Sequence, residues 1–213
     1  MNQVKSLTSE ELFFLGRQMK GPYIDYGYIA AMDDIQKSFA VHEMDNLSSL
    51  QDKGLVTEDF LGNVEPTEKA QIYRPIFFAP EEGRLEICGP AGETKLMDLR
   101  FHIMEDSIIM TSMVKNSIQI WSFNAEELSS ILDAVLNLPK DCEGLMEEEV
   151  TLQDAFKVYV ASYGSVDGTS SRNIWFEKDD RLFKMESDCK VCQVASQQVI
   201  KSIADLYTGE VKT

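Results

Sequence analysis

The sequence predicts an α+β fold with a mainly antiparallel central sheet and flanking helices. Residues 74–123 contain five apolar segments, IFFAP, RLEICG, KLMDLRFHI, SIIMTSM and SIQIWSF, separated by short turns. Such short spacers join antiparallel strands, because a parallel pair needs a longer crossover. In the last segment Ile118 and Trp121 are predicted to point to opposite faces. Both faces therefore need a cover: the chain's own helices on one, and on the other further helices, a second subunit or a client protein.

The N-terminal segment has the pattern of a capped helix. Thr8 is placed to accept a hydrogen bond from the first free amides, and Glu11 is placed to reach back to the backbone of Thr8. Leu7 is expected to pack against Leu12 across this cap. The helix is predicted to end at Gly21-Pro22, because neither residue continues a helix well.

Residues 29–71 are predicted to form short helices followed by a tight hairpin. The helices cover Ala30 to Ala40 and Glu43 to Lys53, Gly62-Asn63 makes the hairpin turn, and Pro66-Thr67 begins another helical turn. A helix followed by a hairpin resembles the recognition helix and wing of a winged-helix module. The N-terminal part of the chain is therefore predicted to be winged-helix-like.

The charge of the chain opposes nucleic-acid binding. A DNA-recognition helix offers Arg, Lys and Asn to the groove, whereas the helix predicted here offers Glu43, Asp45 and Asp52. Over the whole chain, 36 Asp and Glu residues outnumber 20 Lys and Arg residues, which gives a formal net charge of -16. A phosphate backbone repels such a surface, so nucleic acid is not expected as a partner.

A second capped helix is predicted directly after the strand run. Asn124 and Glu127 form its capping pair, and the single capping residue between strand and helix should fold the helix back across the sheet. The segment from Pro139 to Val150 then combines Pro, Gly and an acidic cluster, which is typical of a boundary. It separates an N-terminal half, residues 1–140, from a C-terminal half, residues 141–213, of what is predicted to be one compact fold.

The C-terminal half is predicted to contain a helix, a hairpin, a strand and a final helix. The first helix opens at Thr151, NIWFEKDDRLFKME is a hairpin turning at Asp179-Asp180, KVCQVA is a strand, and Ser196 caps the last helix. The apolar stripe of the first of these helices consists of Phe156, Tyr159, Val160 and Tyr163. The segments SIQIWSFNAEELSSILDAVL and CKVCQVASQQVIKSIADLYT share a strand, a capping residue and an amphipathic helix, which indicates two pseudo-related halves.

No catalytic motif is recognisable, and the chain is predicted not to be an enzyme and to need no cofactor. The two histidines, His42 and His102, lie outside any hydrolase or metalloprotease pattern, and no Walker loop is present. An enzyme would have to use Asp98, Arg100 and His102, which alternate along one predicted strand and so share a face. Their convergence in a deep cleft would indicate an enzyme instead.

The four cysteines, Cys88, Cys142, Cys189 and Cys192, are predicted to be free thiols. The N-terminal segment lacks the apolar core of an export signal, which indicates a reducing, cytoplasmic location. The CxxC pair lies in a predicted strand, where side chains three residues apart point to opposite faces, so no metal site is expected. No apolar run approaches the roughly 20 residues of a membrane-spanning helix, so no membrane insertion is expected either.

Residues of the strands and loops are the candidates for contact with a partner. Met side chains crowd the central strands, and their unbranched thioethers adapt to irregular partner surfaces, although core packing is the commoner role of such a Met. The candidate partner-binding residues are Met110, Met113, Trp121, Gly89, Pro90, Trp175 and Phe176.

The order of these elements carries a resemblance that spans nearly the whole chain. The segments that carry it are the opening helix SLTSEELFFLGRQM, the winged-helix-like segment SSLQDKGLVTEDFLGNVEPTEKAQIYRPIFFAP, the strand run ending in SIQIWSFNAEELSSILDAVL, and a shorter second half. In element order and hydrophobic pattern the chain resembles the EspG-like secretion chaperones of type VII (ESX) systems. It is also similar to the EsaE-like group of Gram-positive bacteria, which accompanies secreted toxins. It departs from the mycobacterial members in its Met-rich strands and strong acidity, which leaves the client open.

The resemblance implies a cytosolic, non-catalytic adaptor that binds a helical toxin or effector. Such an adaptor keeps its client soluble and delivers it to the secretion machinery, including the secretion ATPase. The acidic composition and the two-faced strands suit that role. The main alternative is a winged-helix transcriptional regulator or a ligand-binding module with a dimerising sheet. That alternative would need a basic face on residues 43–53, which the sequence does not supply.

Overall fold

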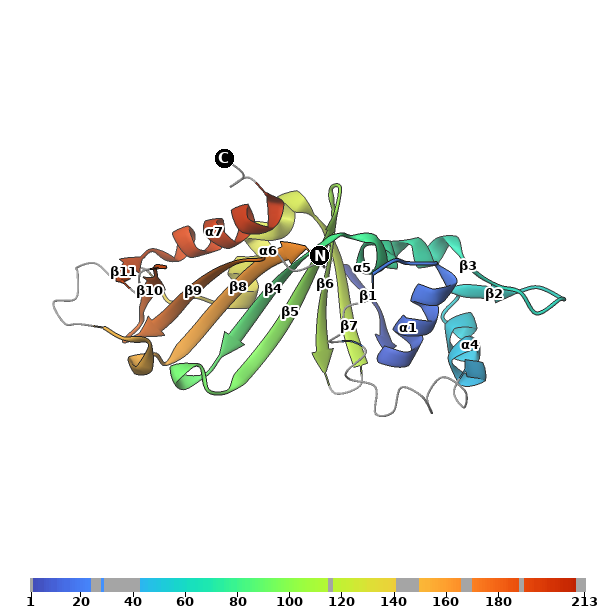
Figure 1. The fold of residues 1–213 in the computed structure, drawn as a ribbon, viewed down its shortest axis with the longest axis horizontal. Helices are drawn as coiled ribbons and strands as arrows, with labels where there is room; N and C mark the ends of the chain where they lie inside the picture. The colour runs from blue at the N-terminus through green and yellow to red at the C-terminus, as the bar shows by residue number, and fades with distance from the viewer. Residues whose placement is uncertain are drawn as a thin grey trace. The chain divides into compact units, whose positions relative to one another are not determined.

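The computed structural model shows a mixed α+β fold built on a large antiparallel sheet with flanking helices (Figure 1). It describes residues 2–23, 28, 43–114, 117–140, 150–165, 170–187 and 190–209. The strands of the sheet are β1 (Asn2–Thr8), β4 (Glu81–Cys88), β5 (Lys95–Met104), β6 (Ser107–Val114), β7 (Ser117–Asn124), β8 (Lys157–Ser165), β9 (Ser170–Lys178), β10 (Arg181–Met185) and β11 (Val191–Val194). Their order in the sheet is β1-β7-β6-β5-β4-β8-β9-β10-β11. The predicted fold class is therefore confirmed.

Helices and one small hairpin complete the described elements. The α-helices are α1 (Ser9–Gln18), α4 (Glu43–Asp52), α5 (Arg74–Phe78), α6 (Leu128–Leu136) and α7 (Ser196–Thr208). The short 3-10 helices are η1 (Glu68–Tyr73), η2 (Pro90–Gly92), η3 (Ala125–Glu127) and η4 (Leu152–Asp154). The hairpin pairs β2 (Val56–Glu58) with β3 (Val64–Pro66). No helix in the described part of the chain is long and apolar enough to cross a membrane.

The chain forms two compact units, and each is assembled from two segments. Unit 1 contains residues 1–80 and 102–123, and unit 2 contains residues 81–101 and 124–213. The meander from β4 to β7 is confirmed, because these four strands are consecutive neighbours in the sheet. The strand β1 was not predicted. It pairs antiparallel with β7, placing Val4 opposite Ile120, and occupies that edge of the sheet.

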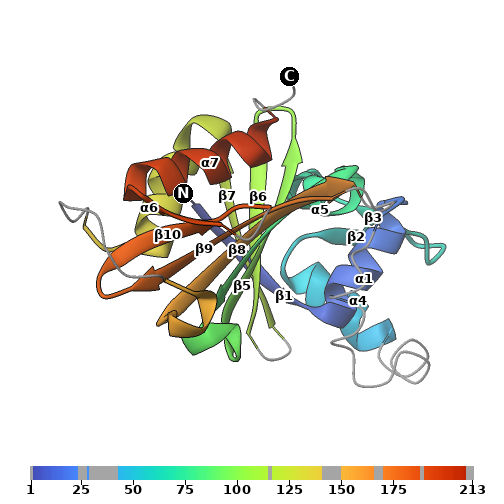
Figure 2. The same cartoon turned by 60° about the vertical axis from the view of Figure 1, so that its left-hand side comes forward.

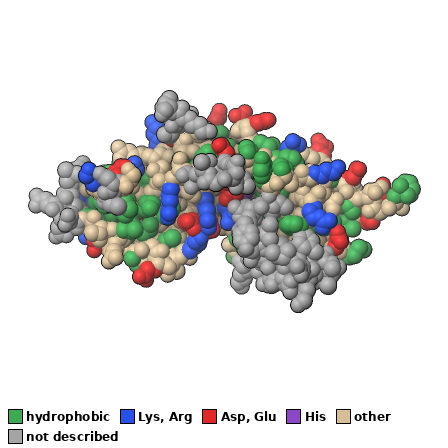
Figure 3. Space-filling view, viewed as in Figure 1, with side chains coloured by type: hydrophobic (Ala, Val, Ile, Leu, Met, Phe, Trp, Pro, Cys, Tyr) green, Lys and Arg blue, Asp and Glu red, His purple; other side chains and the backbone are tan. Residues whose placement is uncertain are grey.

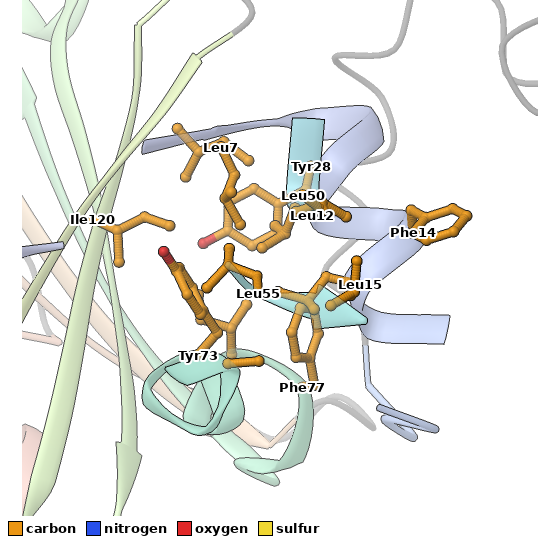
Figure 4. Close-up of a cluster of buried hydrophobic side chains, with 14 of the residues drawn as sticks. Leu7, Leu12, Phe14, Leu15, Tyr28, Leu50, Leu55, Tyr73, Phe77 and Ile120 are labelled. Carbon is orange, nitrogen blue, oxygen red and sulfur yellow. The ribbon is translucent and has the colours of Figure 1, made fainter. Parts of the chain in front are cut away.

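Unit 1 begins with the capped helix that the sequence predicts. The backbone N–H of Thr8 donates to Glu11 Oε2 at 2.8 Å, and the N–H of Glu11 donates to Thr8 Oγ1 at 3.1 Å, which is a complete capping box. Side chains from β1, α1, α4, the segment entering β2, η1 and α5 converge on β7 to form the core of unit 1 (Figure 4). Its members include Leu7, Leu12, Leu15, Leu50, Leu55, Tyr73, Phe77 and Ile120.

The winged-helix-like order of elements is present in unit 1. Helix α4 is followed by the β2–β3 hairpin, and η1 begins after Thr67 as predicted. Two hydrogen bonds anchor the base of the hairpin: Thr67 Oγ1 donates to the carbonyl of Gly54 at 2.8 Å, and the Thr67 N–H donates to the carbonyl of Leu55 at 2.9 Å. The predicted helix from Ala30 to Ala40 lies outside the described residues.

The predicted strand IFFAP is wrong, because Arg74–Phe78 is the helix α5. Pro75 stands in the first turn of α5, where its missing N–H costs no hydrogen bond and its fixed φ suits a helix. Both Ile76 and Phe77 are buried in the unit 1 core. The guanidinium of Arg74 lies 4.6 Å from the ring centroid of Phe78, a cation–π contact along the helix.

The predicted helix opening at Thr151 is also wrong, because only η4 is helical and residues 157–165 form the strand β8. The spacing of Tyr159, Val160 and Tyr163 fits a helix stripe, but VYVASY is also rich in β-branched and aromatic residues. β8 lies between β4 and β9, so both of its backbone edges are hydrogen-bonded. Phe156, assigned to the stripe, is exposed instead.

In unit 2, helices α6 and α7 lie side by side over one face of the strands (Figure 2). The Tyr207 ring packs on Phe101 and Tyr163, with centroid distances of 4.9 and 6.1 Å. The opposite face carries Phe176 and Phe183, whose rings stack at 5.4 Å within a second buried cluster. Both faces of these strands are therefore covered by residues of the chain itself.

The hairpin, the strand and the last helix predicted for the C-terminal half are confirmed in the described residues. The predicted cap is wrong, because Ala195 occupies the N-cap position of α7 and Ser196 Oγ donates instead to the carbonyl of Pro139 at 2.6 Å. The hairpin turns at Asp179-Asp180 between β9 and β10, β11 follows, and α7 begins at Ser196. Both predicted strand-to-helix connections occur, from β7 through η3 to α6 and from β11 to α7. Of the predicted boundary after Pro139, residues 141–149 lie outside the part of the chain that the structure describes.

Candidate functional site

The seven predicted partner-binding residues differ widely in exposure. Met110, Gly89, Trp175 and Phe176 are buried, Met113 and Trp121 are half-buried, and Pro90 is exposed. They are divided between the two units: Met110, Met113 and Trp121 belong to unit 1, whereas Gly89, Pro90, Trp175 and Phe176 belong to unit 2.

Neighbouring elements explain this burial. Met113 packs against the unit 1 core, and the backbone of Trp121 pairs with that of Gln3 in β1, the strand that the sequence did not predict. Trp175 and Phe176 are consecutive residues of β9 and point to opposite faces, both of which are covered. The strand Met and aromatic residues thus serve mainly as packing in this structure, and only Pro90, in η2, is fully available to a partner.

The possible catalytic residues Asp98 and Arg100 are engaged in ion pairs across β4 and β5. The guanidinium of Arg84 donates to both carboxylate oxygens of Asp98, at 2.9 and 2.6 Å. Arg100 pairs with Glu82 at 3.5 Å. Burial acts to raise the pKa of Asp98, but the hydrogen bonds and charge of Arg84, with the charges of Lys95 and Arg100, outweigh it and hold that pKa below its usual value. Asp98 is therefore a stable anion in a cross-strand charge ladder.

His102 belongs to unit 1 and has partners of its own. It is buried, its Nε2 lies 2.9 Å from the hydroxyl of Tyr28, and that hydroxyl also contacts Thr111 Oγ1. Asp98 and Arg100 belong to unit 2, so the structure does not bring the three residues together within one unit. The other histidine, His42, lies outside the described residues.

The cysteines and acidic residues give no metal site in the described ranges. Cys88 and Cys192 are free thiols, as predicted, whereas Cys142 and Cys189 fall outside these ranges. No three His, Cys, Asp or Glu side chains among the described residues are grouped so as to hold a metal ion.

A buried acidic group connects α1 with α4. Glu11 accepts hydrogen bonds from Ser49 Oγ and from Lys53 Nζ, each at 2.5 Å, in addition to the bond from Thr8. Burial acts to raise the pKa of Glu11, but the hydrogen bonds from Lys53, Ser49 and Thr8 and the charge of Lys53 outweigh it, so the pKa lies below its usual value. This network fixes α4, and hence the hairpin that follows it, against α1.

Among the described residues of unit 1, the most exposed large apolar side chains were not among the predicted sites. Phe60 is 95% exposed and Leu61 is 72% exposed at the tip of the β2–β3 hairpin, and Met44 is 74% exposed on α4. Figure 3 shows hydrophobic side chains at this tip. The signal was present in the sequence, because Phe60-Leu61 directly precedes Gly62-Asn63, a pair typical of turns, and polar residues are the rule in such loops.

The electrostatic character of the helix and hairpin differs from that of a DNA-binding winged helix. The exposed face of α4 carries Glu43, Asp45 and Asp52, as the sequence predicts, and the hairpin carries the exposed residues Glu58 and Glu65. Neither element presents the Lys and Arg residues that contact phosphates. No family model matches the sequence, and no curated protein matches it significantly.

Proposed function

We propose that the chain is a non-catalytic adaptor that binds a helical export substrate of a type VII secretion system. In this proposal it works in the cytoplasm, keeps the toxin or effector soluble and delivers it to the secretion machinery. The observation that carries the proposal is the exposure of Met44, Phe60 and Leu61 on α4 and the adjoining hairpin. Large apolar groups held in water on ordered elements are typical of protein-binding sites.

Two further features support binding rather than catalysis. Asp98 and Arg100, the polar residues proposed for an active site, each have an ion-pair partner on β4, in Arg84 and Glu82. The order of α1, α4, the hairpin, the meander and α6 also follows the order on which the resemblance to the EspG-like and EsaE-like chaperones rests. An adaptor of this kind contacts its client through surface groups and needs no catalytic pocket.

The test is affinity capture of the tagged chain from its native host, with quantitative mass spectrometry of the eluate. The expected result is stoichiometric recovery of a helical export substrate or of the secretion ATPase. An unrelated tagged acidic protein, expressed at the same level, controls for charge-driven capture. Recovery of the chain alone, or with a bound small molecule or DNA fragment, would overturn the proposal in favour of a regulator or an enzyme.

A second measurement tests the chaperone activity itself. The substrate recovered by capture is expressed with and without the chain, and the soluble fraction is measured. An adaptor that shields apolar client surface raises the soluble fraction severalfold. Equal solubility in both cases would contradict the chaperone role.

A further inference from the structure

The tip of the β2–β3 hairpin is an ordered loop that presents two large apolar side chains. Phe60 and Leu61 lie between β2 and β3 at 95% and 72% exposure. In contrast, Leu55 and Val56 at the base of the same hairpin are buried in the unit 1 core. The hairpin is thus anchored at one end and projects at the other (Figure 1).

Hydrogen bonds within the tip hold its conformation. Asp59 Oδ1 accepts from the backbone N–H groups of Leu61 and Asn63 at 2.8 and 2.9 Å, and Asp59 Oδ2 accepts from Asn63 Nδ2 at 2.8 Å. The Gly62 N–H donates to the carbonyl of Asp59 at 3.0 Å, and Gly62 has a φ of +84°, which glycine adopts without strain. A loop that is already ordered loses little conformational entropy when it binds a partner.

The charges around the tip indicate which partner fits it. From Val56 to Pro66 the sequence is VTEDFLGNVEP, so three acidic residues flank the apolar pair and no Lys or Arg occurs. Glu58, Asp59 and Glu65 are all exposed. An anionic lipid surface or a nucleic acid would be repelled by these carboxylates. A protein with an apolar groove bordered by Lys and Arg would be complementary in both respects.

We propose that Phe60 and Leu61 are the client-contacting residues, and that they insert into an apolar groove bordered by Lys and Arg on the helical export substrate. This inference rests on the proposed adaptor function and specifies its contact surface. The acidic residues Glu58, Asp59 and Glu65 then face the basic border of the groove. Insertion of such an anchor into a desolvated groove is the arrangement that gives most of the affinity in protein interfaces.

A site-specific cross-link tests the contact. The photo-reactive residue p-benzoylphenylalanine replaces Phe60 in one full-length variant and Phe156 in another. Phe156 is the matched control, because it is also an exposed Phe, at 64%, and belongs to unit 2. After irradiation in host cells, the expected result is a cross-link from position 60 to a helical export substrate, at an apolar position flanked by Lys or Arg, and none to it from position 156.

Affinity measurements with that same substrate complete the test. We expect Phe60→Ser/Leu61→Ser to weaken binding at least tenfold, Glu58→Lys/Glu65→Lys to weaken it severalfold, and Phe156→Ser to change it less than twofold. Both double variants alter exposed side chains only, so their thermal unfolding should match that of the parent chain.

The outcomes separate this inference from the proposed function. If the parent chain captures an export substrate but Phe60→Ser/Leu61→Ser binds it equally well, the tip proposal is overturned and the adaptor function stands. Cross-linking of position 60 to the secretion ATPase would overturn the tip proposal and leave the adaptor function standing, whereas failure of the parent chain to capture either an export substrate or the ATPase would overturn the adaptor function itself. Cross-linking of position 60 to lipid, or to a second copy of the chain, would overturn the proposed contact with a client.

Discussion

Glu11 shows at the residue scale how one carboxylate serves two purposes in unit 1. It completes the capping box of α1 with Thr8, and it accepts hydrogen bonds from Ser49 and Lys53 of the α4 region. Its side chain is buried, whereas Lys53 retains some contact with water. Removing the carboxylate charge would leave these donors without their anionic acceptor.

We therefore predict that Glu11→Gln lowers the free energy of unfolding by about 2 kcal/mol at neutral pH. Urea denaturation followed by circular dichroism measures the difference. Glu43→Gln is the matched control, because Glu43 is an exposed carboxylate that faces Arg17 at 4.0 Å, and its loss should cost less than about 0.5 kcal/mol. If Glu11→Gln and Glu43→Gln lowered the free energy of unfolding equally, the hydrogen bonds of Glu11 would not stabilise unit 1 as predicted.

The same carboxylate should make stability depend on pH. Because the pKa of Glu11 is lower in the folded chain than its ordinary value of 4.5, its contribution is fully present above that value and is lost as the pH falls through the folded pKa. The difference in unfolding free energy between the parent chain and Glu11→Gln should thus shrink below about pH 4.5. A difference that stays constant down to about pH 3 would show that Glu11 is not held as an anion.

Two buried tyrosines of unit 2 differ in their hydrogen bonding. The hydroxyl of Tyr159 donates to Glu177 at 3.0 Å, whereas that of Tyr207 is buried with no partner among the described residues. Burial raises the pKa of both hydroxyls, with the negative charges of Glu177 and Glu82 adding to the shift at Tyr159 and Tyr207 respectively.

Substitution by Phe should distinguish these two environments. Tyr159→Phe removes the hydroxyl that donates to Glu177, whose carboxylate keeps its ion pair with Lys157 at 3.8 Å, and should destabilise the fold by about 1–2 kcal/mol. Tyr207→Phe removes a hydroxyl without a partner among the described residues and should leave stability unchanged or raise it by up to about 1 kcal/mol. Thermal and urea denaturation of both variants test this. A loss of stability in Tyr207→Phe as large as that in Tyr159→Phe would reveal a partner for its hydroxyl.

At the scale of elements, the packing of α7 on β4 depends on a glycine. A Cβ atom added to Gly83 would lie 2.8 Å from the Tyr207 ring, much closer than carbon atoms approach one another. We predict that Gly83→Ala costs about 1–3 kcal/mol, because α7 must shift or the ring must leave its rotamer. Urea denaturation provides the value, and near-UV circular dichroism reports on the Tyr207 environment.

The matched control for this substitution is Gly89→Ala in the same unit. Gly89 is also buried, but an added Cβ would meet its neighbours at 3.7 Å or more, and the φ of -75° suits alanine. Its expected cost is below about 0.5 kcal/mol. If Gly83→Ala lowered the free energy of unfolding as little as Gly89→Ala does, the close contact between α7 and β4 would be excluded.

Local chemistry explains which elements could be predicted. The capping box of α1 and the turn at Asp179-Asp180 each depend on a few adjacent residues, and both predictions were correct. The hairpin predicted around Gly62-Asn63 is present, but its turn is centred on Phe60-Leu61, because the Gly62 N–H donates to the carbonyl of Asp59. The segment from Lys157 to Tyr163 and the segment IFFAP were predicted wrongly, because short apolar runs fit both helix and strand. Whether such a segment forms a helix or a strand depends on which neighbouring elements offer it hydrogen bonds and apolar contacts.

At the scale of the whole molecule, the net charge of -16 should govern how the chain meets its client. Long-range attraction to a basic surface accelerates encounter, and added salt screens it. For the captured substrate we predict that the association rate falls about tenfold between about 0.05 M and about 0.5 M salt, while the dissociation rate changes much less. Stopped-flow fluorescence measures both. An association rate independent of salt would exclude a basic client surface.

The candidate surface could be predicted only in part. The residue counts showed that the chain is acidic, and its residue patterns contained no recognisable catalytic motif. The seven contact residues, however, were predicted from their side-chain chemistry and their place in strands and loops. Side-chain type does not specify burial, and Met110, Trp175 and Phe176 are buried. Phe60 and Leu61 could have been predicted, because two large apolar residues directly precede Gly62-Asn63, a pair typical of turns.

The sequence by itself determined the fold class, the capped helix α1, the helix-and-hairpin order after Glu43 and the β4–β7 meander, since these follow from capping, turn chemistry and alternation. Only the tertiary structure decided that β1 pairs with β7, that residues 157–165 form a strand between β4 and β9, and that two sequence-distant segments make up each unit. The physical reason is that a strand is stable only where a neighbour supplies its hydrogen bonds, and that neighbour lies far along the chain.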